Sequence, residues 1–251
     1  MNAGRFRALV AAFASAMLLV AGGVPASAQP FEPYAKGSAA NAMYDLLFCD
    51  DPSAFQPQPT DKPADWQALL FGVAPDPAMV AALAQNNLAE SRVRALAFNW
   101  LRADGRATPK GVVLGVIIEV PLDGGLDVLA AYADGRVRYI NHTGKLAVIE
   151  PGGAPDVSLQ AKRVIELARP VVERIGPWDK PRLPPPAKPS IRLTFIVSDG
   201  LYFGQGPFQV MQQDALAGPL LQQESRLLVL VVDKTVAEQA PSSAMAGRAH
   251  R

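Results

Sequence analysis

Few side chains in this 251-residue sequence could carry out chemistry. It contains two histidines, His142 and His250, and a single cysteine, Cys49. No His-x-x-x-His or Cys-x-x-Cys spacing occurs, and G-x-S-x-G and P-loop motifs are also missing. A cysteine–histidine enzyme would need Cys49 and His142 to meet, and nothing near either residue in the sequence would activate it. The sequence therefore predicts no catalytic residue, no metal site and no cofactor.

Carboxylates give the alternative interpretation. Asp50 and Asp51 are adjacent at the end of an expected helix, where such pairs are usually solvated. If they met His142 or Asp199 in one cleft, the chain could be an exported hydrolase-type enzyme that uses carboxylates for acid/base work. Convergence of these four residues would favour that interpretation, and scatter would favour a binding protein.

Hairpin geometry selects one polar pair. Asp134-Gly135 is typical of a two-residue type I′ turn, which would place Asp127 opposite His142, with their Cβ atoms about 5 Å apart. We therefore take Asp127 and His142 as candidate binding residues. This register also predicts a buried and a solvent-facing side of the hairpin. The buried side would hold Val128, Ala130, Tyr132, Val137 and Tyr139, and the other side Asp127, Arg136, Arg138 and His142.

A second turn carries aromatic residues. Asp199-Gly200 predicts another hairpin of the same type, followed by Tyr202 and Phe203 and then by Gly-Gln-Gly around Gln205. An aromatic side chain that points outward here would suit contact with a peptide or partner, whereas the alternative is that both rings complete the core edge. Gly-Gln-Gly lacks the strand–loop–helix context of a phosphate loop and is interpreted as a bulge or turn. Tyr202, Phe203 and Gln205 complete the set of candidate binding residues.

The elements that position these residues predict an α+β fold. We expect an antiparallel sheet of about seven strands built from hairpins, one long crossing helix, and an N-terminal helical section. The order helix, strands, helix, strands is similar to that of profilin-like and roadblock-like domains, in element order alone. Residues 177–189 are rich in proline and are expected to form a stiff strap over the sheet. Helices are expected at 41–49, 77–85, 90–103 and 156–175; strands at 112–120, 126–133, 146–149, 191–198, 201–203, 208–211 and 227–232, with a further strand returning from Asp134-Gly135.

The N-terminus has the layout of a secretory signal peptide. Arg5 and Arg7 precede the apolar run Ala8–Val20, and a small-x-small site ends at Ala28. Cleavage there would place the protein in the periplasm or outside the cell. Of the 24 basic and 23 acidic residues, the leader holds two basic ones, so the mature net charge would be −1. That charge gives no electrostatic case for nucleic acid, and no later apolar run is long enough for a membrane span.

The expected organisation is a signal peptide at 1–28, a helical section at 29–105, a sheet domain at 106–233 that packs with it as one unit, and a disordered tail at 234–251. Cys49 has an apolar setting and is expected to be buried. We interpret the chain as an exported, non-enzymatic binding or protein-interaction module of a bacterial envelope. Its partner would be an envelope protein or peptide, and its oligomeric state stays open.

Overall fold

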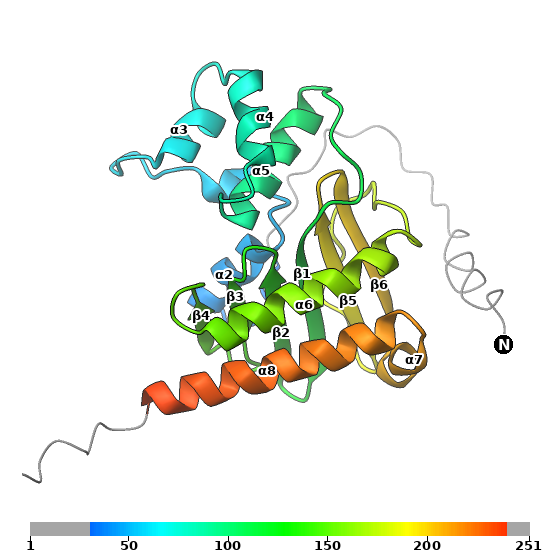
Figure 1. Ribbon diagram of the computed structural model, residues 1–251. Coiled ribbons are helices and arrows are strands. Elements are labelled where there is room, and N and C mark those ends of the chain that lie inside the picture. Colours follow the sequence, from blue (N-terminus) through cyan, green and yellow to red (C-terminus); the bar gives the residue numbers. More distant parts are fainter. Residues whose placement is uncertain (1–30, 240–251) are drawn as a thin grey trace, which may run out of the picture.

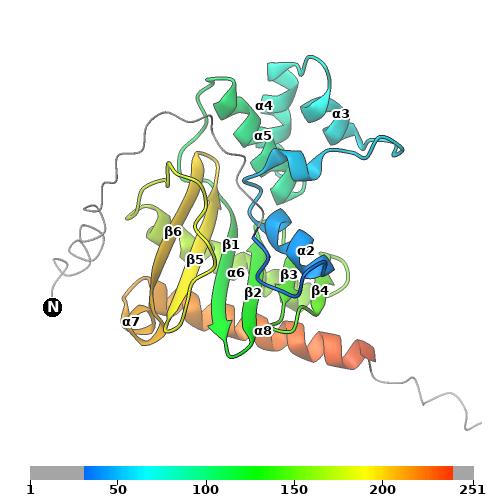
Figure 2. The same ribbon diagram turned by 180° about the vertical axis from the view of Figure 1, so that it is seen from behind.

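The computed structural model describes residues 31–239, so the expected signal peptide and the last part of the expected tail lie outside the described residues. Within this range an antiparallel sheet of six strands, in the order β4-β3-β2-β1-β5-β6, lies between two layers of helices (Figures 1 and 2). The α+β prediction is confirmed, with six strands where about seven were expected. The elements are α2 (Ala39–Leu47), η1 (Pro52–Phe55), α3 (Asp65–Phe71), α4 (Pro77–Gln85), α5 (Ser91–Ala103), β1 (Val113–Leu122), β2 (Gly125–Tyr132), β3 (Val137–Ile140), β4 (Leu146–Ile149), α6 (Pro155–Val172), β5 (Ser190–Val197), β6 (Gly200–Pro207), α7 (Phe208–Gln213) and α8 (Ala217–Gln239).

Helices cover both faces of the sheet. α6 and α8 pack on one face, and α2, α4 and α5 contribute to a second core on the other. β1 lies near the middle of the sheet, and its residues from Val113 to Glu119 are all buried. This confirms the prediction of a strand covered on both faces, because a nearly continuous apolar run suits that position. Within residues 31–239, none of the helices is both long and apolar enough to span a membrane.

The predicted register of the β2–β3 hairpin is wrong by one residue. The N–H of Tyr132 donates to the carbonyl of Arg136 at 3.0 Å, so the loop holds three residues and Gly135 takes a φ of +88°. Such a loop, with glycine in the left-handed region, is the other common hairpin solution for this sequence. A contact from a distant part of the chain also stabilises this loop: the side chain of Asp134 accepts a hydrogen bond from the N–H of Ser91 at 2.7 Å.

The shifted register also changes the two sides of the hairpin. Leu129 lies opposite Tyr139, and Ala131 opposite Val137, so Val137 and Tyr139 point away from the face that holds Val128, Ala130 and Tyr132. The predicted solvent-facing side is therefore wrong as well, since both faces are covered and Arg138 is buried. The β5–β6 turn is also displaced by one residue. Its central pair is Ser198-Asp199, and Gly200 is the first residue of β6.

Two segments predicted to be strands are helices. Phe208–Met211 lies in α7 and Leu227–Val232 in α8. A run of six apolar residues does not distinguish a buried strand from a buried helix. Here Leu220, Leu227 and Val231, spaced seven and four residues apart, lie on one side of a helix and pack in the core shared with α6 and the sheet. α8 continues to Gln239, so residues 234–239 are helical and not disordered as expected. Cys49 is buried as predicted, and burial raises the pKa of its thiol.

Candidate functional site

Asp127, near the start of β2, lies close to His142 in the turn between β3 and β4. Asp127 Oδ1 accepts a hydrogen bond from the backbone N–H of His142 at 2.6 Å and lies 3.4 Å from His142 Nδ1. Its Oδ2 accepts from the hydroxyl of Tyr139 at 3.1 Å. The contact comes from the turn and not from a cross-strand pair, because the β2–β3 ladder ends at Ile140. The carboxylate therefore holds this turn in place.

The aromatic residues after the second turn are not displayed on the surface. Tyr202 is buried in the core and donates a hydrogen bond to Asp199 Oδ2 at 2.9 Å, and burial, followed by this bond, raises its pKa to about 12. Phe203 is half-buried, with its ring centroid 4.8 Å from that of Trp178 in an edge-to-face contact. Tyr202 thus joins the core, whereas Phe203, on the opposite face of β6, packs against Trp178.

Gln205 is exposed, but it ends a polar row that crosses three strands and whose other two members, Glu119 and Arg192, are buried. Glu119 of β1 lies opposite Arg192 of β5, which lies opposite Gln205 of β6. Arg192 Nη1 is 3.5 Å from Glu119 Oε2, and Arg192 Nε and Nη2 donate to Gln205 Oε1 at 2.9 and 2.8 Å. The Tyr44 hydroxyl donates to Glu119 Oε1 at 2.6 Å. Burial raises the pKa of Glu119, although Arg192 and Tyr44 act in the opposite direction.

The proline strap, residues 177–189, is held over this row by two arginines. Arg192 donates to the carbonyls of Leu183 and Pro184 at 3.0 and 2.6 Å. Arg182 of the strap donates to Asp45 Oδ1 at 2.9 Å and to Asp50 Oδ2 at 2.8 Å. Burial alone would lower the pKa of Arg182, but Asp50, Tyr44 and Asp45 together outweigh it and the pKa is raised. The strap is thereby tied both to the sheet and to α2.

Replacing Arg182 with lysine should lower the free energy of unfolding by about 1 kcal/mol. Lysine keeps the charge but loses the planar fork that reaches both carboxylates, and it also loses the stacking of the guanidinium 4.0 Å from the ring centroid of Phe48. Urea unfolding of the two proteins measures the difference. Lys180→Arg is a suitable comparison on the same segment, and a larger loss there than at Arg182 would contradict the assignment.

This polar cluster is a closed structural element. Glu119 is fully buried, and the groups that meet it belong to α2 and β5. A substrate could therefore reach the carboxylate only if these elements were displaced. Hydrogen bonds and ion pairs within the protein therefore explain why these polar residues are in the core, and no catalytic role is needed.

The carboxylates of the enzyme interpretation do not meet. Asp50 is paired with Arg182, and Asp51 caps η1 by accepting from the N–H of Ser53 at 2.9 Å. Asp199 accepts from the N–H of Gly111, just before β1, whereas His142 packs against Gly125, just after the other end of β1. A strand of this length separates the two by roughly 30 Å. Between residues 31 and 239, no three His, Cys, Asp or Glu side chains gather as metal ligands would.

β4 is one of the two edge strands of the sheet, and the backbone on its outer side is open. The N–H of Asn141 donates to the carbonyl of Lys145, and hydrogen-bonded pairs alternate along an antiparallel ladder. Ala147 and Ile149 therefore bond to β3, whereas the N–H and C=O groups of Leu146 and Val148 point to the open side. No hydrogen bond from another described residue reaches those groups.

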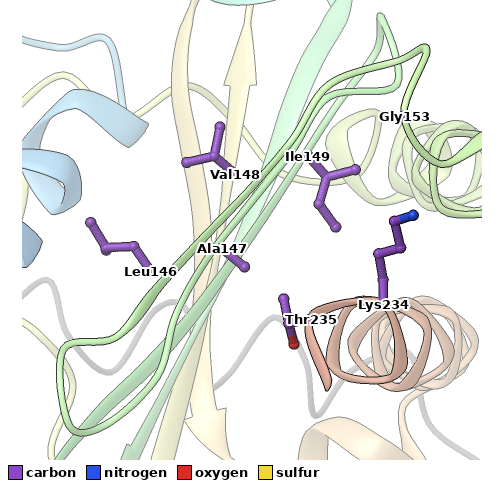
Figure 3. Close-up of a pocket in the computed structure, with 7 residues that line it drawn as sticks. All are labelled: Leu146, Ala147, Val148, Ile149, Gly153, Lys234 and Thr235. Carbon is purple, nitrogen blue, oxygen red and sulfur yellow. The ribbon is translucent and has the colours of Figure 1, made fainter. Parts of the chain in front are cut away.

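Apolar surface and a hollow accompany this edge. Leu146 is 40% and Val148 is 51% exposed, and their side chains lie on one side of the strand. On the other side, Ala147 and Ile149 point toward the C-terminal part of α8, where Lys234 and Thr235 lie across a hollow of about 200 Å³ (Figure 3). α8 runs past the edge of the sheet next to β4 (Figure 1). An added strand would therefore meet protein on its α8 side.

Ion pairs fix the end of β4. Glu150 accepts from Arg138 Nη2 and from Arg136 Nε, each at 2.6 Å. Partial burial would raise the pKa of Glu150, but the two guanidinium groups prevail and lower it. Arg138 also donates to the carbonyl of Ile149 at 3.2 Å. The open edge is thus presented on a rigid strand.

The sequence predicted a strand at 146–149 but not its position at the edge of the sheet. That position depends on the sheet order, which no local pattern contains. One signal for the edge position was present in the sequence: this strand comes directly before the crossing helix. A helix that leads the chain to the opposite side of the sheet leaves the strand before it at an edge. Comparisons with protein-family models, curated proteins and solved structures returned no match.

Proposed function

We propose that this chain is an exported, non-enzymatic binding module that accepts an extended segment of a partner protein at the free edge of β4. The observation that carries the proposal is the outward-facing backbone of Leu146 and Val148, bordered by exposed apolar side chains and by the hollow beneath α8. Exposed edges of this kind are normally blocked by charges, proline or covering elements. Here two of the four residues of the edge strand are exposed aliphatic ones.

The chemistry of the edge defines the partner. The N–H and C=O groups of Leu146 and Val148 would pair with the backbone of an added strand. Alternate side chains of the added strand would lie beside Leu146 and Val148, and those between them would face the hollow near Thr235. A segment with apolar residues at alternate positions therefore fits best. The partner would be an exported protein or peptide with such a segment, in the periplasm or outside the cell.

Changes confined to β4 should weaken binding of such a segment at least tenfold. We would measure fluorescence anisotropy with a labelled synthetic peptide that has valine at alternate positions, threonine between them and lysine at both ends. Val148→Pro removes an outward N–H and leaves the bonds to β3, and Leu146→Lys places a charge on the edge. The loss of one hydrogen bond, together with the steric effect of the new side chain, costs about 1.4 kcal/mol of binding free energy. That cost corresponds to a tenfold loss of affinity.

Two controls make this test specific. Met79→Lys introduces the same charge at an exposed apolar residue of α4 and should leave the affinity unchanged. A peptide with proline at its centre should bind poorly, because it cannot pair along its length. Equal affinities for the wild type, Val148→Pro and Leu146→Lys would contradict the proposal, as would failure of the peptide to bind at all.

A further inference from the structure

α8 carries an apolar stripe on its outward face. Val229, Val232 and Val236 are exposed and recur at spacings of three and four residues, so they lie along one side of the helix; we call them the outer stripe. The opposite side buries Leu220, Leu227 and Val231 against α6 and the sheet, as the position of α8 on the outside of this layer shows (Figure 1). A surface helix normally has one apolar side, and α8 has two.

Two opposite charges border the outer stripe on the same flank. Arg226 and Asp233 are seven residues apart, so they project in nearly the same direction from α8. Neither has a charged residue three or four positions away along the helix. Neither forms an ion pair with another described residue, and the one contact of Arg226 is to Gln223 at 3.5 Å. Among residues 31–239 of a single copy, these two charges have no ion-pair partner.

We propose that the outer stripe is a docking surface for a second copy of this chain, with the two α8 helices antiparallel. A two-fold axis would place Val229 against Val232 of the second copy, and each contact would occur twice. In an antiparallel helix pair the same flanks face each other. Arg226 would therefore meet Asp233 of the second copy, and Asp233 would meet Arg226.

The charge pattern selects this alignment over its neighbours. A shift of one heptad in one direction would bring Asp233 against Asp233 of the second copy, and a shift in the other direction would bring Arg226 against Arg226. A parallel pair would place each charge opposite Leu221 or Leu228, which offer no counter-charge. Antiparallel pairing centred on Val229 and Val232 thus satisfies both the apolar stripe and the charges. The seam is short, so self-association should be weak and should depend on protein concentration.

Charge reversal tests the pairing. Sedimentation equilibrium over a wide range of concentrations should show a monomer–dimer equilibrium for the chain from Gln29 to Arg251. Arg226→Asp or Asp233→Arg alone should weaken the dimer at least tenfold, because each places like charges together at both symmetric contacts. The double variant Arg226→Asp with Asp233→Arg should recover to within about threefold of the wild type, since the opposite charges meet again.

Controls separate this surface from others. Arg163→Asp makes the same change in charge at an exposed position of α6 and should not affect the dimer. Val232→Asp should abolish it, with an unchanged circular dichroism spectrum because the residue is exposed. A monomer at every concentration would overturn the proposal. It would also be overturned by a dimer that the single reversals leave intact, or by one that the double reversal does not restore.

Discussion

Replacing Arg192 with methionine should lower the free energy of unfolding by about 3–5 kcal/mol, which is a large fraction of the stability of a domain of this size. Arg192 is the only guanidinium within ion-pair distance of Glu119 among the described residues, and it also binds Gln205 and two strap carbonyls. Its removal would leave a carboxyl buried with one hydrogen bond, from Tyr44. Equilibrium unfolding in urea measures the loss.

A double variant isolates the charge. Glu119→Gln in the Arg192→Met background removes the uncompensated acid and keeps an oxygen that can accept from Tyr44. We expect this double variant to be more stable than Arg192→Met alone, because the two residues are directly coupled. If the effects of the two single changes simply added, Glu119 and Arg192 would not be the interacting pair described above.

Replacing Glu224 with leucine should raise the free energy of unfolding at neutral pH by about 2–3 kcal/mol. Glu224 lies on the buried side of α8 between Leu220 and Leu227 and is 1% exposed. No described residue donates a hydrogen bond to either of its carboxyl oxygens. A leucine at this position would continue the apolar stripe without the cost of burying an acid.

The same residue should make stability depend on pH in a defined direction. Burial raises the pKa of Glu224 well above its usual range, whereas in the unfolded chain the value is about 4.3. Between those two values the folded state keeps a proton that the unfolded state has lost. The contribution of Glu224 is therefore fully present at low pH and falls as pH rises, by at most about 1.4 kcal/mol per pH unit.

Glu224→Gln is the matched control, because it keeps the shape and polarity but cannot ionise. The difference in unfolding free energy between wild type and Glu224→Gln should shrink toward acidic pH and grow toward neutral pH. A difference that does not change between these conditions would mean that the carboxyl is ionised in the folded state or is not buried.

Local patterns in the sequence predicted much of the fold. The continuous apolar run that became β1, and the capped, periodic segments that became α4 and α5, needed no knowledge of distant contacts. Both hairpin turns were predicted in the right region of the chain, but each is displaced by one residue. At Asp134-Gly135 the loop holds three residues where two were expected, and Asp-Gly suits both lengths. That single shift exchanged the sides on which Val137 and Tyr139 lie.

Features set by distant parts of the chain were not predictable in this way. Leu227–Val232 became helical because Leu220 and Val231 pack on α6 and the sheet. Glu119, Arg192 and Gln205 meet only because β5 pairs with β1, more than 70 residues earlier in the sequence. The open edge at β4 likewise depends on the sheet order. Asp127 and His142 do lie close together, but through the β3–β4 turn and not through the predicted cross-strand pair.

Amide hydrogen exchange at β4 tests the central claim most directly. In the free protein the amides of Leu146 and Val148 should exchange rapidly, whereas those of Ala147 and Ile149 should be protected by their bonds to β3. Saturating amounts of the alternating valine peptide should slow exchange at Leu146 and Val148 and leave Met79 unaffected. Unchanged exchange at these two amides with the peptide bound would show that it binds elsewhere and would contradict the assignment of β4 as the binding edge.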